Sequence, residues 1–71
     1  MKNYDEIIYH NLKSEIENSP KSKTQIAEEV GISKPTLSQY LSGRASPSLS
    51  TFARLCVVLD CSADDILGIN K

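Results

Sequence analysis

The side chains from Lys34 to Gln39 offer hydrogen-bonding groups and carry no negative charge. The Gln39 amide can donate and accept at once, which allows a bidentate pair with N6 and N7 of adenine. The Lys34 ammonium suits O6 and N7 of guanine, or a phosphate. An α-helix fits the major groove of B-DNA, where the base edges distinguish all four base pairs. On a helix, these residues would therefore form a surface that can contact base edges.

The stretch at residues 34–41 has the pattern of such a helix. Its apolar residues share one face: Leu37, Tyr40 and Leu41. With that face against a core, a turn of about 100° per residue places Pro35 and Gln39 nearly opposite the core. Ser33 can cap the helix, and Pro35 falls in its first turn, where a missing N–H breaks no intrahelical bond.

A second short helix is predicted just before it, at residues 23–30. Ser22 can cap this helix, and the Gln25 side chain can return a hydrogen bond to the Ser22 backbone. Its apolar face comprises Ile26, Ala27 and Val30. Gly31 follows, where a left-handed residue ends a helix with the least strain. The two helices and the glycine turn between them predict a helix-turn-helix over residues 22–43.

Longer helices are predicted on either side of this motif. Residues 4–18 form an amphipathic helix capped by Asn3, because apolar residues recur at every fourth position from Ile8 to Ile16. Ser48 can cap a helix that ends near Asp60. The apolar positions of that helix have the spacing of a buried stripe: Leu49, Phe52, Leu55, Cys56 and Leu59. We expect Phe52 to be the central residue of the core.

A short last helix completes the predicted fold. Ser62, with Asp65 three residues on, can cap it, and its buried side chains are Ile66, Leu67 and Ile69. Apolar and polar residues nowhere alternate over the length of a strand. We therefore expect an all-α fold of five helices in a single domain over residues 1–71, close to the smallest size that one core can stabilise.

Three segments together closely resemble the lambda-repressor and Cro type of helix-turn-helix, also called the Xre family. They are Gln25 to Gly43, then Pro-Ser-Leu-Ser-Thr-Phe-Ala-Arg-Leu, then Asp-Cys-Ser-Ala-Asp-Asp-Ile-Leu, in the family's order and spacing. The resemblance covers roughly residues 12–67. It implies a five-helix DNA-binding domain and a sequence-specific transcriptional regulator, expected to be a repressor that binds double-stranded DNA as a homodimer.

The resemblance also implies which residues contact DNA. Family members touch bases with the first residues of the second motif helix and with one about a turn later, which here means Lys34, Pro35, Ser38 and Gln39. Pro35 departs from this pattern because it has no donor, so at most it touches a thymine methyl. Phosphate contacts are expected at helix starts and in the loop after the recognition helix: Lys23, Thr36, Arg44, Ser46 and Ser48. The alternative for each is a solvated surface residue, and for Arg44 a charge at a helix C-terminus.

Two further expectations concern apolar residues. Several family members pair an arginine late in the first helix with a glutamate late in the recognition helix; Ile16 and Leu41 stand at these positions here, so we expect an apolar contact. Val57 stands where the family often has a charged residue. Together with other apolar residues near the C-terminus it would form a dimer interface, comprising Val57, Val58, Ile66 and Ile69. The alternative is an isolated exposed valine.

The charge distribution favours a phosphate-binding middle. The net charge is −1, but residues 21–54 hold five basic residues against two acidic ones, a balance of +3, and both flanking segments are acidic. Such segregation can orient a small domain on DNA. No apolar run approaches the roughly 20 residues of a membrane span, and the N-terminus is not a signal peptide, so we expect a cytoplasmic protein without membrane contact.

Other functions are less well supported by the residues. An enzyme is not expected, because the chain has one histidine, no nucleophile paired with a base, and too few residues for a cleft. Cys56, Cys61 and the distant His10 are too few ligands for a metal site, and no cofactor is implied; we expect the cysteines to be reduced and to pack as small apolar residues. Two alternatives stay open: an antitoxin that binds a toxin and represses its own operon, and a protein-interaction module.

Overall fold

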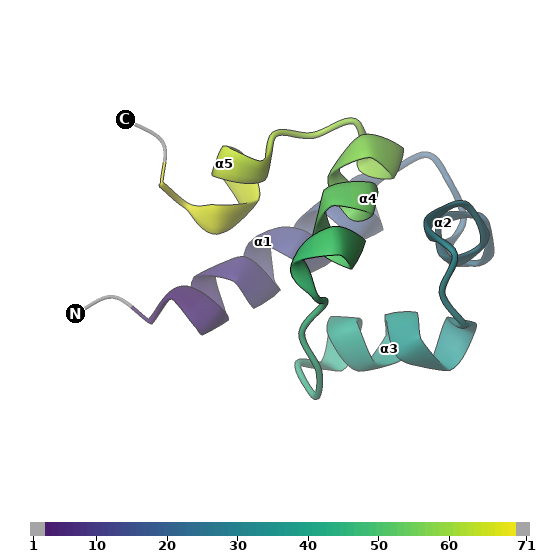
Figure 1. Cartoon of the computed structure of the whole chain (residues 1–71), viewed down its shortest axis with the longest axis horizontal. Helices are drawn as coiled ribbons and strands as arrows, with labels where there is room; N and C mark the ends of the chain where they lie inside the picture. Colours follow the sequence, from purple (N-terminus) through teal and green to yellow (C-terminus); the bar gives the residue numbers. More distant parts are fainter. Residues whose placement is uncertain (1–2, 70–71) are drawn as a thin grey trace.

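Caps and apolar periodicity divide the chain into helices joined by short loops. The computed structural model describes residues 3–69 and contains, within that range, five α-helices and no strand (Figure 1). The helices are α1 (Tyr4–Asn18), α2 (Lys23–Val30), α3 (Lys34–Ser42), α4 (Leu49–Leu59) and α5 (Ala63–Leu67). The predicted all-α fold of five helices is thus confirmed.

Each helix begins after a residue whose side chain accepts a hydrogen bond from a backbone N–H of the first turn. Asn3 accepts from Glu6 in α1, and serines accept from Gln25, Thr36 and Thr51 in α2, α3 and α4. At α5, Ser62 accepts from Asp64 and not from the predicted third position. A cap of this kind typically stabilises a helix by about 1 kcal/mol. The helix starts were therefore predictable from local sequence.

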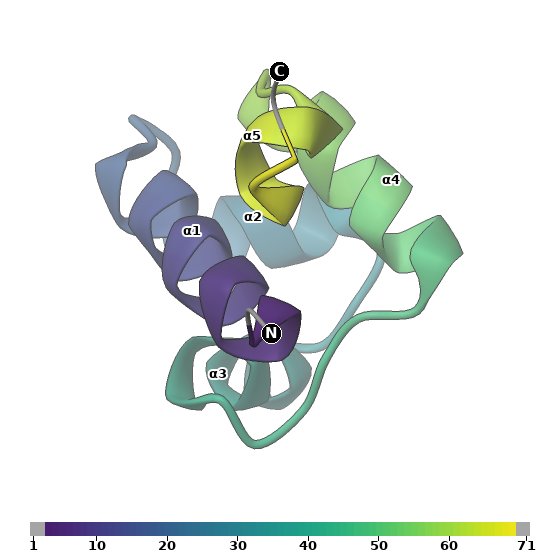
Figure 2. The same cartoon turned by 90° about the vertical axis from the view of Figure 1, so that its left-hand side faces the viewer.

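The helices pack so that α3 lies along one side of the molecule. α1 packs against α5 and α3, and α2 packs against α4 and α3. Figure 1 shows α3 along the bottom with α4 rising away from it, and Figure 2 shows α3 beneath α1 with α5 above. The fully enclosed side chains between the helices are Ile26, Leu37, Leu55, Ile66 and Val30. α3 therefore has one buried face and one free face.

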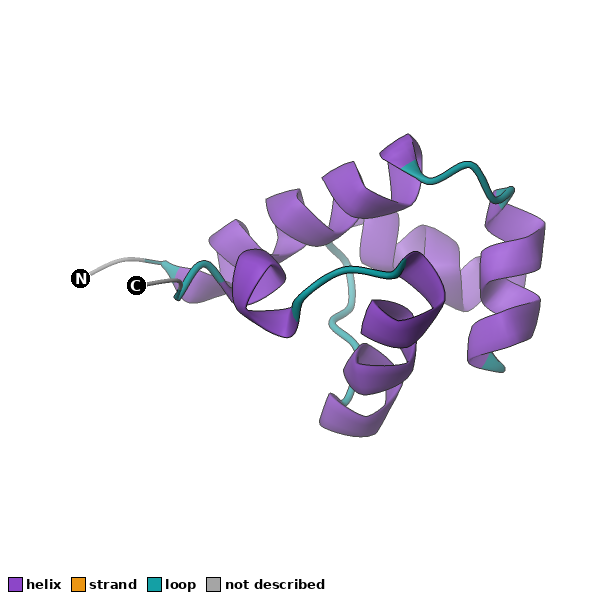
Figure 3. Cartoon of the chain, turned by 90° about the horizontal axis from the view of Figure 1, so that it is seen from above, coloured by secondary structure: helices purple, strands orange, loops and turns teal. Residues whose placement is uncertain are grey.

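Two predictions about the core need correction. Leu49 was placed in the buried stripe of α4 but is 87% exposed. Leu49 is the first residue of α4, and the first turn of this helix projects beyond its neighbours (Figure 3). The apolar spacing of α4 therefore extends to a turn that no other helix covers. Phe52 is buried at 9% exposure but lies at the edge of the core, where it lines a pocket of about 200 Å³, while Leu55 is at the centre with no exposure.

The burial of Ile69, near the C-terminus, also differs from the prediction. Ile69 was expected to be buried with α5 but is 48% exposed, because α5 ends before Gly68 and Ile69 follows the helix.

Leu41 is only half-buried, whereas Ile16 is buried. Both belong to or pack against the same apolar cluster. A direct contact between Ile16 and Leu41 stays a prediction.

Candidate nucleic-acid interface

The free face of α3 presents the side chains that were predicted to touch bases. Lys34, Pro35, Ser38 and Gln39 are all exposed, whereas Leu37 on the opposite face is 2% exposed. Pro35, Ser38 and Gln39 line a shallow hollow of about 410 Å³ together with Ser42 and Arg44. The structure thus brings together three of the four predicted base contacts and one predicted phosphate contact.

Backbone hydrogen bonds hold Arg44 next to Gln39. The carbonyl oxygen of Gln39 accepts from the N–H of Arg44 at 3.0 Å and from that of Ala45 at 3.3 Å. The chain can turn back in this way because Gly43 has a left-handed backbone with a φ of 78°. Ser42, which sequence reasoning did not include, lies one turn after Ser38 and donates its hydroxyl hydrogen to the same carbonyl at 3.1 Å. Helical spacing from Ser38 could have identified it.

The N-terminus of α3 is built around Ser33. Its hydroxyl oxygen accepts from the Thr36 N–H at 3.2 Å and lies 2.8 Å from the Thr36 hydroxyl oxygen. Thr36 is half-buried, so its hydroxyl is held against the cap, while Lys34 extends from the exposed first position of the helix. Of the two, Lys34 is the more accessible to DNA.

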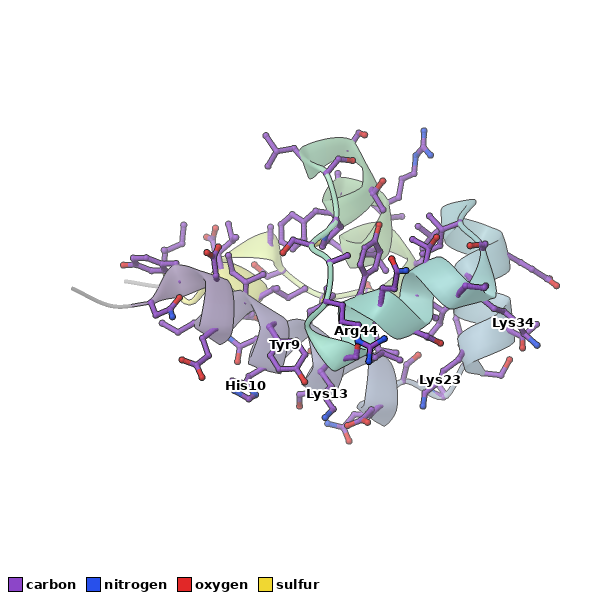
Figure 4. All side chains as sticks on the ribbon, turned by 90° about the horizontal axis from the view of Figure 1, so that it is seen from below. Tyr9, His10, Lys13, Lys23, Lys34 and Arg44 are labelled. Atoms are coloured by element: carbon purple, nitrogen blue, oxygen red, sulfur yellow. The ribbon has the colours of Figure 1, made fainter. Side chains whose placement is uncertain are left out.

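The other predicted phosphate contacts lie at the starts of α2 and α4 and in the loop between α3 and α4. Lys23, Arg44, Ser46 and Ser48 are exposed. In the view from below, Lys34, Lys23 and Arg44 are seen across the side of the molecule that carries α3 (Figure 4). The Ser48 hydroxyl serves as the cap of α4, 3.1 Å from the Thr51 hydroxyl oxygen. Basic side chains and helix starts therefore share this side.

The first turns of the helices differ in charge. α2, α3 and α4, all within the described residues, have no acidic residue in the first turn, and α2 and α3 begin with Lys23 and Lys34. α1 and α5 instead have two acids each in the first turn. A helix N-terminus carries partial positive charge and is stabilised by an anion. The first turns of α2, α3 and α4 therefore carry no acidic side chain that would repel a phosphate.

One basic residue of the predicted phosphate-binding middle is already paired. The Lys21 ammonium lies 2.9 Å from a Glu29 carboxylate oxygen and donates to the Val58 carbonyl oxygen at 3.0 Å. Hydrogen bonds from Lys21 first and from Gln25 second lower the pKa of Glu29. The Gln25 side chain thus lies near Glu29, and its backbone N–H donates to the Ser22 hydroxyl oxygen at 3.1 Å, which is one of the two hydrogen bonds of the predicted capping box.

The four residues predicted to form a dimer interface do not make one exposed patch. Ile66 has no exposure, because it is enclosed in the core, so its assignment to an interface was wrong. Val58 is half-buried against the same core. Val57 is 79% exposed and Ile69 48% exposed. Val57 and Val58 line a shallow groove of about 270 Å³ between α2 and α4, with Glu29 and Arg54 at its polar positions.

Comparison with known proteins decides the family. A family model described as helix-turn-helix matches residues 13–66, which is most of the chain. The chain belongs to this family. The model covers the lambda-repressor type of helix-turn-helix, so the resemblance noted from the sequence is confirmed.

A solved structure agrees with the helix-turn-helix assignment. This chain is similar to the solution structure of the SOS-response transcriptional repressor LexA from Eubacterium rectale, with a TM-score of 0.81 and 25% sequence identity. The match covers 99% of this chain and 78% of that one. No curated protein sequence matches the chain. The family and this neighbour support a DNA-binding transcription regulator.

Other kinds of site find no support in the described part of the chain. Residues 3–69 contain no group of three or more His, Cys, Asp or Glu side chains placed to hold a metal ion. Both cysteines are free thiols, Cys56 buried and Cys61 half-buried. None of the helices in this range is long and apolar enough to cross a membrane.

Proposed function

We propose that this helix-turn-helix protein is a repressor that binds a specific DNA sequence with α3 in the major groove. The observation that carries the proposal is the free face of α3, where Pro35, Ser38 and Gln39 share one hollow with Arg44. Lys34 adds a cation at the first position of the helix. An α-helix fits the major groove, and hydrogen-bond donors and acceptors on its free face can pair with those of the base edges. This face carries no acidic side chain that would repel the DNA.

The proposed complex has distinct contacts for positioning and for specificity. Gln39 would pair with adenine, and Lys34 with guanine or a phosphate. Lys23, Arg44 and the serines at positions 46 and 48 would bind phosphates around the groove and fix the docking angle of α3. The acid-free starts of α2 and α4 support this division, because their N–H groups can donate to phosphate oxygens.

The repressor role is supported by the LexA neighbour, which is named a transcriptional repressor. We further propose that it binds a nearly palindromic site as a homodimer in the cytoplasm, with exposed Val57 as the apolar centre of the interface.

The test begins with selection of bound duplexes from a random pool, followed by sequencing. The expected result is a short motif with two related half-sites, and in vitro transcription from a promoter that contains it should fall as protein is added. Recovery of no enriched sequence, together with no salt-sensitive duplex binding at low salt, would contradict the proposal. That outcome would instead favour a protein-interaction module.

A further inference from the structure

Tyr9 of α1 packs against the turn that positions Arg44. A Cβ at Gly43 would lie 3.4 Å from Tyr9 Cε1 and 3.5 Å from Cζ, so the ring lies close to the glycine and leaves room for a Cβ. Because Cζ carries the hydroxyl group, the polar end of Tyr9 reaches the residue directly before Arg44. Tyr9 is half-buried, so the ring is held in place by its surroundings.

Lys13 lies one turn further along α1 on the same side. Its ammonium is 5.9 Å from the centroid of the Tyr9 ring, and the His10 ring is 4.8 Å from that ring on the other side. Figure 4 shows Tyr9, His10 and Lys13 on α1 in the view that also shows Arg44 and α3. A cation and a phenol on α1 thus lie close to each other, and the phenol lies next to the turn that precedes Arg44.

Acidic residues mark the limit of this surface. Asp5 and Glu6 line the hollow that runs from Tyr9 towards the start of α1, and Glu6 lies 3.9 Å from His10. Glu15 is half-buried and acts on the Cys61 thiol, so it faces the end of α4 and not the Tyr9 side. Glu17 is exposed one turn after Lys13, so acidic side chains flank Tyr9 and Lys13 on both sides along α1.

We propose that Tyr9 and Lys13 form a phosphate-binding site with Arg44, outside the helix-turn-helix itself. The bound group is a phosphodiester of the duplex that flanks the bases contacted by α3, so the inference rests on the proposed function. The Lys13 ammonium neutralises the phosphate, and the Tyr9 hydroxyl donates to one of its oxygens. A side chain at Gly43 would strain the left-handed backbone there, although a Cβ would meet the Tyr9 ring at ordinary contact distance.

Two substitutions separate the charge from the hydroxyl. Lys13→Met keeps the apolar stem, and neutralising one phosphate contact lowers the slope of log K against log salt by about 0.9. Between 50 and 200 mM salt, the variant should therefore lose about threefold less affinity than the parent. Tyr9→Phe keeps the ring on Gly43, so it should weaken binding to all duplexes several-fold with the slope unchanged. Neither variant should change the preferred base sequence.

The matched control is Lys21→Met, the same substitution at a lysine whose ammonium is already paired with Glu29. It should leave the salt slope at the parent value. Thermal melting of all three variants shows whether each is folded, and ethylation interference provides an independent readout. Ethylating the phosphate bound by this site should impair the parent and have little further effect on Lys13→Met.

The outcomes distinguish this inference from the proposed function. A parent that binds no duplex at low salt contradicts the function itself. If the parent binds and Arg44→Gln lowers its salt slope, while folded Lys13→Met and Tyr9→Phe both bind like the parent, the α1 site is refuted and the helix-turn-helix contacts stand.

Discussion

Gln39 is the side chain whose chemistry most directly distinguishes one base pair from another. It lies on the free face of α3 in the same hollow as Ser38 and Arg44. Its own carbonyl oxygen anchors the backbone of the following loop. The turn therefore holds the backbone of Gln39 in place, while its side-chain amide stays exposed for contact with a base.

Replacing Gln39 with alanine should weaken binding to the selected sequence by about 1 to 3 kcal/mol and relax the preference at one base pair. Binding to unrelated duplexes should change little, because the phosphate contacts remain. Fluorescence anisotropy with the selected duplex and with single-base variants measures both effects. Gln25→Ala deletes the same amide from α2, where it is directed to Glu29, and should leave the base preference intact. An unchanged base profile in Gln39→Ala would show that α3 docks differently.

Arg44 and Lys23 are predicted to act on the DNA backbone alone. Arg44→Gln or Lys23→Gln should weaken binding to every sequence alike, and each should lower the slope of log K against log salt by about one unit. The reason is that each cation releases counterions from one phosphate. Titrations at four or more salt concentrations give the slope. If the double variant keeps the parent slope, neither residue is at the interface.

At the scale of helices, the Lys21 to Glu29 pair joins the loop after α1 to α2 and, through the Val58 carbonyl, to α4. The hydrogen bond from Lys21 lowers the pKa of Glu29 in the folded protein. A lowered pKa means that this stabilisation is present above the unfolded pKa and is lost as pH falls through the folded pKa. Removing Lys21 should therefore alter acid stability.

Thermal melts of Lys21→Met between pH 3 and pH 7 test this. The parent should lose stability more steeply than the variant as the pH falls, because only the parent loses the Glu29 pair on protonation. The magnitude should be small, since both side chains are partly exposed and screened. Parallel pH curves for the two proteins would mean that the pair does not contribute to stability.

α4 ends at a residue whose backbone is unfavourable for its side chain. Asp60 has a φ of 54°, in the left-handed region, and its negative charge lies at a helix C-terminus. Asp60→Gly relieves both costs but makes the unfolded chain more flexible, so the net gain in the free energy of unfolding should be about 0.5 to 1 kcal/mol. Asp60→Asn removes only the charge and should gain less. Urea denaturation measures the difference, and a destabilised glycine variant would rule out this account.

Across the whole molecule, the helices and the free face of α3 were predictable because their signals are local. Each serine cap lies within three residues of the N–H that it accepts from, and the apolar face of α3 follows from helical period alone. The burial of Leu49 was predicted wrongly, since periodicity does not show where neighbouring helices end. The burial of Ile66 was predicted correctly, and that burial is what excludes it from the predicted interface. The Tyr9 contact with Gly43 gave no signal in the sequence, because it joins residues far apart in the chain.

Self-association is the property of the whole molecule on which operator symmetry depends. The exposed apolar residues left for it are Val57 in α4 and Ile69 after α5, because Ile66 is enclosed in the core. Acidic Asp60 and Asp64 lie near the same end of the chain, so they would repel their symmetry mates close to a two-fold axis. A dimer centred on Val57 should therefore be weak, and it should form more readily at higher salt or on DNA.

Val57→Lys should shift the monomer–dimer equilibrium towards monomer, because a charge would replace the apolar centre of the proposed interface. Sedimentation velocity from micromolar to millimolar concentration measures this equilibrium. On DNA, the variant should bind two half-sites about one helical turn apart, roughly 34 Å, with less cooperativity than the parent and with unchanged affinity for a single half-site. Val57→Ser removes the apolar side chain without adding a charge, so it should shift the equilibrium in the same direction if the apolar contact holds the dimer. A parent that stays monomeric over this range and binds half-sites independently would leave Val57 an isolated exposed valine.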